Sequence, residues 1–228
     1  MALENYFTAS DGTKLFYYKL GQGPVLIFLH GNSESSWIFR KQIRFLKANY
    51  TCLALDTRAH GRSHFRGKRI KFEQLAQDLL EIMNAENIAV ANLLGFSDGA
   101  NTAMLFASQY PERVNKLILN AGNLTQLGFI RPVGLLIKLI GKVAYKSPVL
   151  RLLSEETGLK FDDLKNIKAD TLVLNGQFDV VKSHHAREIA ASIPHSHFQI
   201  LSFGTHLTFY FRPGRFNTIV NNFLKNKT

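Results

Sequence analysis

Short apolar runs alternate with longer amphipathic segments along most of the chain, and this alternation predicts strands that alternate with helices. Apolar strands joined by helices are typical of a mostly parallel sheet with helices on both faces. We therefore predict an α/β fold. The predicted strands are 25–29, 52–55, 90–94, 114–119, 171–174 and 197–201, and the predicted helices are 37–49, 72–87, 99–109, 183–192 and 213–225.

The first twenty residues depart from this alternation. Residues 6–8 and 14–18 are rich in aromatic and other strand-forming side chains, and Asp11 and Gly12 between them form a strong two-residue turn signal. This pattern predicts an antiparallel hairpin ahead of the parallel strands.

The alternation also stops between residues 122 and 169. Residues 135–140 and 149–153 are typical of short amphipathic helices with basic outer positions. We expect residues 123–169 to form a short helical cap, inserted into a single domain that spans residues 1–228. A helix lying on a membrane surface is the alternative, which the lysines at 138, 142 and 146 leave open. The position of the segment after a strand favours the cap.

Length and composition fit one domain of this kind. A chain of 228 residues can bury a substantial core. The first twenty residues lack an apolar stretch of signal-peptide length, and no stretch matches an uncharged membrane span. We expect a soluble, cytoplasmic protein without integral membrane association. Cys52 is the only cysteine, so an internal disulfide is impossible, and its apolar neighbours predict a buried thiol.

The formal net charge of +11 raises the question of nucleic-acid binding. Basic residues are spread evenly along the chain and match no nucleic-acid-binding module, so we expect no nucleic-acid partner. Residues 58–71 and 131–151 contain several basic residues and no acidic one. At the mouth of an active site these runs would favour acidic substrates, and a solvated basic rim is the alternative.

The sequence Gly-Phe-Ser-Asp-Gly at residues 95–99 lies where a predicted strand meets a predicted helix. A serine at such a sharp turn presents its Oγ at the edge of the sheet, and glycines two residues before and after it relieve the crowding. The N-terminus of the following helix stabilises negative charge beside the serine. Ser97 is therefore the candidate nucleophile.

A nucleophilic serine needs a histidine base, and a carboxylate usually orients that histidine. Asp179 follows the predicted strand 171–174 at its carboxyl end, where open α/β sheets place functional groups, whereas Asp170 lies at the other end. We expect Asp179 to be the orienting acid, and a helix-capping role is the alternative.

His206 follows the last predicted strand in a loop of small residues, so we expect it to be the base. His184 and His185 begin a predicted helix, where we expect them at the surface. His60 and His64 belong to the basic run 58–71 and could contact substrate.

The loop that follows the first parallel strand, His-Gly-Asn-Ser at residues 30–33, has the position of an oxyanion loop. An oxyanion hole takes one backbone N–H from the residue after the nucleophile and one from this loop. These donors would be the amides of Asp98 and Asn32. Gly31 also permits a tight turn, which is compatible with the same role.

With the order serine, aspartate and histidine in place, the chain resembles the α/β-hydrolase superfamily over nearly its full length. Residues 56–63 resemble the family's D-x-R-G-H-G-x-S loop, with Ala59 in place of the usual glycine. The string GFSDGAN resembles the GFSDGGN elbow of small esterase-like and carbon–carbon-bond hydrolases, with Ala100 in place of a second glycine. Neither substitution changes a candidate catalytic group.

This resemblance implies acyl transfer to Ser97, without a metal or an organic cofactor. No zinc-ligand spacing or phosphate-binding loop competes with it in the sequence. We expect a small-molecule acyl substrate, namely a small or medium carboxylic ester. The alternatives are an acyltransferase, a carbon–carbon-bond hydrolase or a non-catalytic ligand-binding homologue, and the oligomeric state is not predicted. The candidate apolar walls of the substrate site are Trp37, Phe96, Leu124 and Phe129.

Overall fold

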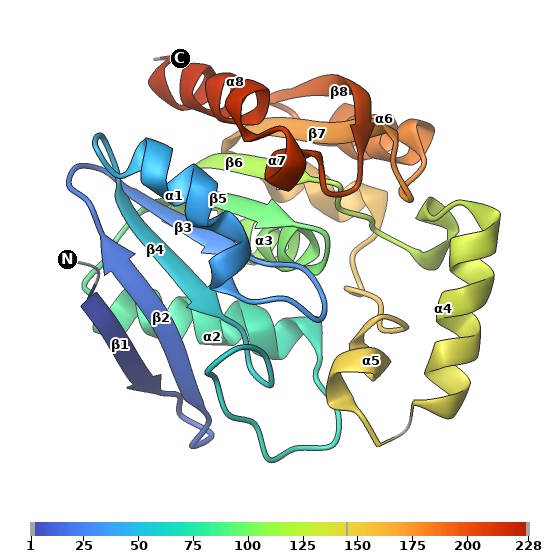
Figure 1. Cartoon of the computed structure of the whole chain (residues 1–228), viewed down its shortest axis with the longest axis horizontal. Helices are drawn as coiled ribbons and strands as arrows, with labels where there is room; N and C mark the ends of the chain where they lie inside the picture. The colour runs from blue at the N-terminus through green and yellow to red at the C-terminus, as the bar shows by residue number, and fades with distance from the viewer. Residues whose placement is uncertain (1–2, 145, 227–228) are drawn as a thin grey trace.

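A twisted sheet passes through the middle of the molecule in the computed structural model, which describes residues 3–144 and 146–226 (Figure 1). Within these residues the sheet has eight strands in the order β1-β2-β4-β3-β5-β6-β7-β8. The strands are β1 (Leu3–Thr8), β2 (Lys14–Leu20), β3 (Val25–Leu29), β4 (Thr51–Asp56), β5 (Ala91–Phe96), β6 (Val114–Asn120), β7 (Asp170–Phe178) and β8 (Ser196–Thr205).

The predicted hairpin and the mostly parallel sheet are both confirmed. β1 pairs antiparallel with β2, and β2 pairs antiparallel with β4, whereas the pairs from β4 through β3 to β8 are parallel. Because the carboxyl ends of parallel strands meet at one edge of the sheet, the loops after β3, β5, β7 and β8 converge there.

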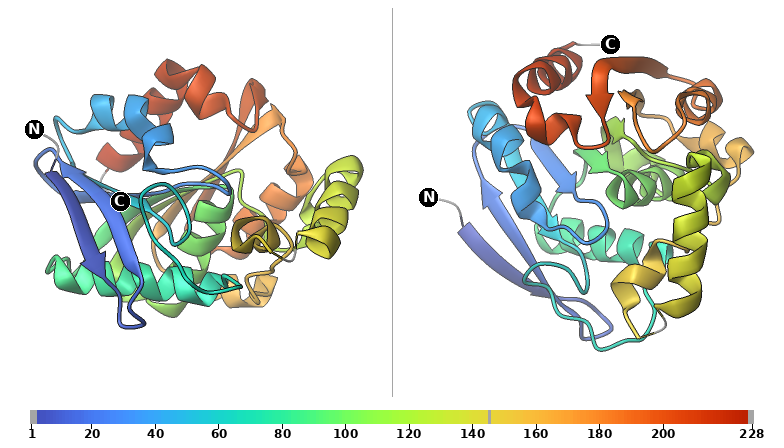
Figure 2. Two further views of the ribbon diagram at one scale, coloured as in Figure 1. Left: turned by 60° about the horizontal axis from the view of Figure 1, so that its bottom comes forward. Right: turned by 45° about the vertical axis from the view of Figure 1, so that its right-hand side comes forward.

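Helices cover both faces of the sheet (Figure 2). The longer helices of the sheet-covering layers are α1 (Arg40–Leu46), α2 (Phe72–Ala85), α3 (Asp98–Gln109), α6 (Ser183–Ser192) and α8 (Pro213–Lys225). They are joined by the short α7 (Thr208–Phe211) and by the 3₁₀ helices η1 (Ser36–Phe39), η2 (Pro111–Arg113), η3 (Gln126–Gly128) and η4 (Phe161–Asn166).

The core has two halves because successive side chains of a strand point to opposite faces. In β3, Leu26 and Phe28 join the cluster that α1 and α8 cover. Ile27 and Leu29, the alternate residues, join the cluster that α2, α3 and α6 cover. Burial on both faces explains why the central strands are continuous apolar runs in the sequence.

Element boundaries differ from the predictions mainly where pairing extends a strand beyond its apolar run. β7 continues to Phe178 and β8 to Thr205, and these two residues are paired with each other. Phe178 is exposed, so this extension depends on backbone pairing rather than on burial. The predicted helix 37–49 consists of η1 followed by α1, which ends at Leu46.

Residues 123–169 contain the two expected helices, α4 (Arg131–Val143) and α5 (Pro148–Leu152). Both figures place them outside the sheet and its covering helices. Ile137 of α4 and Leu152 of α5 are buried. Among the described residues, no helix has the length and apolar character needed to cross a membrane.

Candidate active site

Ser97 is the single residue between the end of β5 and the start of α3. Its backbone has a φ of +52° and a ψ of −120°, a strained conformation for a residue with a Cβ. The turn also brings backbones very close together. A Cβ on Gly95 would lie 2.3 Å from the carbonyl oxygen of Gly99, and a Cβ on Gly99 would lie 2.0 Å from that of Leu29. Larger residues at either glycine would therefore break the turn that presents Ser97.

Three side chains from three strand ends form a hydrogen-bonded chain. His206 Nε2 lies 3.3 Å from Ser97 Oγ, and His206 Nδ1 lies 2.7 Å from Asp179 Oδ1. Because a carboxylate oxygen accepts hydrogen bonds, Nδ1 holds the imidazole proton and Nε2 is free to accept the serine proton. The ring of His206 also packs on Phe96, with the ring centroids 4.8 Å apart.

The carboxylate of Asp179 is held by the loop after β7. Its Oδ1 accepts the amide of Val181 at 3.0 Å, and its Oδ2 accepts the amide of Gly176 at 3.2 Å. The side chain is only 1% exposed. The N-cap of α6 is Lys182, so Asp179 does not occupy the helix-capping position that was the alternative interpretation. Its Oδ1 also accepts the hydrogen bond from His206 Nδ1.

The adjacent histidines His184 and His185 differ in solvent exposure. His184 is exposed, as expected, but the expectation for His185 is wrong because one face of α6 packs onto the core. His185 Nε2 accepts the amide of Leu124 at 3.0 Å, and burial lowers the pKa of this histidine. His185 therefore has a structural role.

His60 is likewise buried, in a cluster with His30 and Thr57. His30 Nε2 accepts the amide of Thr57, which fixes the loop after β4 against the loop after β3. Burial lowers the pKa of His30 to about 4, consistent with a role in shaping the loop. The suggestion that His60 contacts substrate is not supported, because its side chain faces this cluster.

The predicted oxyanion loop lies against the serine turn. A Cβ on Gly31 would lie 3.1 Å from the Cβ of Ser97, so the two backbones are close. Asn32 Nδ2 donates to Asp98 Oδ2 at 3.1 Å and to the carbonyl of Val149 in α5 at 2.9 Å. Asp98 is the first residue of α3, where backbone N–H groups lack intrahelical acceptors. The structure thus brings the two candidate donor segments to the same turn.

Two carboxyl groups near the serine turn were not predicted: Asp98 is buried and Glu34 is half-buried. Burial raises the pKa of Asp98 to about 6, against the opposing effects of Asn32 and His206. Burial also raises the pKa of Glu34 to about 7, although Glu34 accepts the amide of Gly31 at 3.2 Å and lies near His206. No sequence signal marks Glu34, because its environment comes from the folding of the loop onto the serine turn.

We expect Glu34→Gln to change how stability depends on pH. The unfolded carboxyl ionises near its ordinary value of 4.5, whereas the folded carboxyl keeps its proton until about pH 7. Across this window the folded state binds more protons, so the free energy of unfolding falls as the pH rises. Glutamine keeps an acceptor for Gly31 but cannot ionise. Relative to wild type, Glu34→Gln should therefore be more stable at pH 8 than at pH 4 by about 3 kcal/mol.

Urea unfolding of both proteins at pH 4 and pH 8 measures this difference. Glu73→Gln is the matched control, since Glu73 is exposed on α2. An equal pH dependence for wild type and Glu34→Gln would contradict the assignment of a neutral, half-buried Glu34 at pH 5 to 6.

A cavity of about 200 Å³ opens at Ser97 and His206. Its apolar wall comes mainly from α4, whose residues Val133, Ile137 and Ile140 recur at helical spacing on one side. This helical spacing is the sequence feature from which these wall residues could have been predicted. The full lining is Ser97, Asp98, Asn101, Asn123, Gln126, Phe129, Val133, Leu136, Ile137, Ile140, Leu153, Glu155, Val180 and His206.

Of the four predicted wall residues, only Phe129 lines this cavity. Trp37 is 58% exposed in η1, with its ring over the guanidinium of Arg40. Leu124 is buried in the main core, and Phe96 supports the ring of His206 from within the core. These three predictions are wrong because residue type alone does not determine the direction in which a side chain points.

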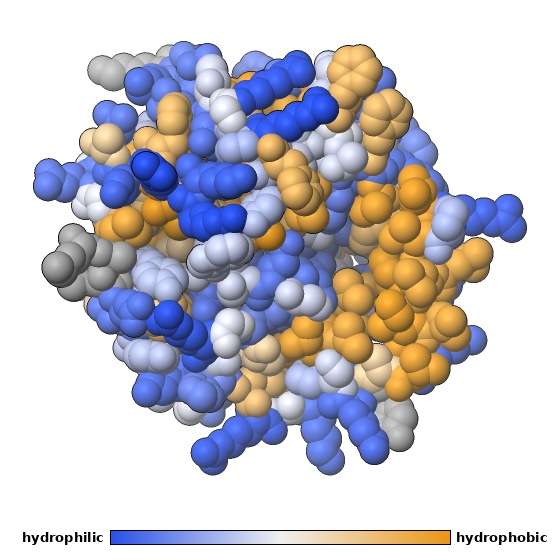
Figure 3. Space-filling model, viewed as in Figure 1, coloured by the Kyte–Doolittle hydropathy of each residue, from blue (hydrophilic) through white to orange (hydrophobic). Residues whose placement is uncertain are grey.

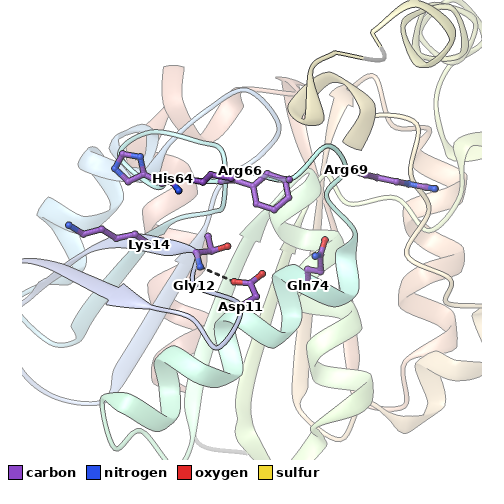
Figure 4. A pocket seen from close by; sticks show the side chains of 10 residues that line it. Asp11, Gly12, Lys14, His64, Arg66, Arg69 and Gln74 are labelled. Atoms are coloured by element: carbon purple, nitrogen blue, oxygen red, sulfur yellow. Dashed lines mark hydrogen bonds between the residues drawn. The ribbon is translucent and has the colours of Figure 1, made fainter.

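A larger cleft than the cavity at Ser97 lies elsewhere (Figure 4). It has a volume of about 770 Å³ and is formed by the β1–β2 turn and the loop at residues 64–69. Lys14, His64, Arg66 and Arg69 lie along it, whereas Ser97 and His206 do not. The basic run 58–71 therefore borders this cleft. Among the described residues, no lysine or arginine lines the cavity at Ser97. The basic run 131–151 includes α4, which forms the cavity wall, so steering of acidic substrates by this run stays a prediction.

Comparison with known proteins agrees with this architecture. Residues 24–148 match the alpha/beta hydrolase fold family, and the chain belongs to that family. It is 31% identical over 123 residues to the serine hydrolase BPHL of Homo sapiens, a match that covers 50% of this chain and 42% of that protein. The chain spans less than half the length of the curated relatives it matches.

Solved structures match over almost the whole chain. A hydrolase from Pseudomonas aeruginosa PA01 is 21% identical, with 98% of each chain covered and a TM-score of 0.81. The enol-lactonase from Burkholderia xenovorans LB400 is 20% identical, with 97% of this chain and 100% of that chain covered and a TM-score of 0.82. At these identities the similarity shows the fold.

Proposed function

We propose that this protein is a serine hydrolase that cleaves small or medium carboxylic esters through an acyl-enzyme on Ser97. The observation that supports this most strongly is the hydrogen-bonded chain from Ser97 through His206 to Asp179. The three residues follow three different strands, in the order typical of the family. Such an arrangement at the carboxyl edge of the sheet is what nucleophilic catalysis by serine requires.

In the proposed reaction, Ser97 Oγ attacks the ester carbonyl carbon while His206 Nε2 takes the hydroxyl proton. The amides of Asn32 and Asp98 stabilise the resulting oxyanion, and Asp179 orients His206 and stabilises its positive charge. Collapse of this intermediate breaks the ester C–O bond, and His206 returns the proton to the departing alcohol. A water molecule, deprotonated by His206, then attacks the acyl-enzyme and releases the acid and free Ser97.

The cavity supports the proposed size of the acyl group. About 200 Å³ beside Ser97 accommodates a short chain, and the aliphatic side chains of Val133, Ile137 and Ile140 favour an apolar one. We propose that residues 123–169 act as the cap, because α4 contributes this wall. Phe129 is the proposed aromatic contact. Lactones belong to the same substrate class, and one protein of similar fold is an enol-lactonase.

The test combines an ester panel with covalent labelling. We expect wild-type protein to hydrolyse p-nitrophenyl esters of short and medium chains, and to react with a fluorophosphonate probe whose adduct maps to the peptide containing Ser97. A panel of small lactones and aryl esters of increasing length then defines the acyl preference. Absence of both turnover and labelling would overturn the hydrolase proposal, whereas transfer of the acyl group to an added alcohol in preference to water would indicate an acyltransferase.

A further inference from the structure

One side of α4 is apolar and exposed, in addition to the side that lines the cavity. Leu135, Leu136, Leu139 and Val143, here called the α4 outer face, are each between 56% and 63% exposed. Residues at this spacing are neighbours on a helix, so they form a continuous strip. Figure 3 shows apolar surface gathered over the part of the molecule where α4 lies. Exposed apolar strips of this kind mark interaction sites.

The apolar strip has a basic border. Lys138 and Lys142 are exposed and lie three residues after Leu135 and Leu139, so each lysine adjoins a leucine on the helix surface. Arg131 at the start of α4 extends the same border. Residues 131–151 contain no acidic side chain. The helix therefore presents leucines and positive charges toward the same side.

We propose that the α4 outer face binds the surface of an anionic lipid bilayer. Leucine side chains on one face of a helix enter the boundary between head groups and acyl chains, and lysines beside them attract anionic head groups. The long lysine side chains can keep their ammonium groups among the phosphates while their methylenes cover apolar surface. A second copy of the chain fits less well, because a symmetric contact would bring the lysines of the two copies together.

This orientation also brings the cavity to the lipid. Leu136 belongs to the α4 outer face and lines the cavity that contains Ser97 Oγ. The surface that contacts lipid is thus continuous with the cavity wall. An apolar ester dissolved in the bilayer would reach the serine without crossing a polar surface at this edge.

Vesicle co-sedimentation tests the proposal. The measurement uses Ser97→Ala protein, so that no lipid is consumed and failure of the hydrolase proposal does not affect the result. We expect binding to vesicles of phosphatidylcholine with phosphatidylglycerol, weaker binding to phosphatidylcholine alone, and release by salt. Adding Leu135→Asn and Leu139→Asn should abolish binding, and adding Lys138→Gln and Lys142→Gln should weaken it by roughly fivefold for each lysine.

The matched controls lie away from α4. Val90→Asn changes an apolar residue that is 49% exposed ahead of β5, and Lys47→Gln changes an exposed lysine after α1. Both should bind vesicles as the parent does, and circular dichroism should show that all variants remain folded. No binding of the parent to anionic vesicles, or equal binding of parent and leucine variant, would overturn the proposal. So would a dimer in light scattering that the leucine variant dissociates and that does not bind vesicles.

Discussion

Ser97→Ala is expected to lower kcat for aryl ester hydrolysis by roughly 10⁴- to 10⁶-fold and to abolish fluorophosphonate labelling. Alanine keeps the Cβ and the backbone of the turn but lacks the oxygen that forms the acyl-enzyme. The fold should be unaffected, because Ser97 Oγ forms a side-chain hydrogen bond only with His206 among the described residues. Steady-state kinetics with p-nitrophenyl esters measures kcat, and thermal unfolding measures the stability of the fold.

Ser108→Ala is the matched control for this variant. Ser108 lies near the C-terminal end of α3, the helix that follows the serine turn. Its hydroxyl donates to the carbonyl of Asp163 at 3.0 Å. It should retain wild-type kcat. Residual turnover of Ser97→Ala near the wild-type rate would show that another group attacks the ester.

His206→Ala is expected to reduce kcat by a similar factor, since the serine then lacks its base. His206 Nε2 is the imidazole nitrogen within reach of Ser97 Oγ, at 3.3 Å. His184→Ala should leave kcat unchanged because His184 is exposed on α6. Initial rates with the same aryl ester compare the two variants.

The assignment of the base would fail if His206→Ala and His184→Ala lost activity equally. His185 is an unsuitable control, because it accepts the amide of Leu124 and its removal would leave that buried donor unpaired. His206→Ala also removes the hydrogen-bond partner of the buried Asp179 carboxylate. Chemical denaturation of His206→Ala therefore accompanies the kinetics, so that lost activity is distinguished from lost folded protein.

The fold was largely predictable because its signals are local. Strands buried on both faces appear as continuous apolar runs, and in the helices between them apolar residues recur about every 3.6 residues. The alternation of elements therefore follows from the sequence. The predicted helices 183–192 and 213–225 match α6 and α8 to the residue. Strand ends were less predictable, because β7 and β8 extend by pairing with each other through exposed residues.

The walls of the candidate site were much less predictable. Three aromatic residues and one leucine were chosen by type, yet Trp37 lies outside the cavity and Leu124 lies in the core. The aliphatic residues of α4 line the cavity because the helix turns one side toward Ser97. Helical spacing in 131–143 identifies which residues share a side, but it does not identify which side faces the serine.

The succession of strands and helices along the chain and the sharp turn at Ser97 follow from the amino-acid sequence, because hydrophobic period, glycine sterics and apolar runs act within a few residues. The position of His206 Nε2 beside Ser97 Oγ, from a residue 109 positions away, depends on the folded chain. The folded chain also creates the environment that favours the protonated form of Glu34, and it turns the leucines of α4 toward solvent. These properties depend on contacts and desolvation between distant segments, which no local pattern of residues encodes.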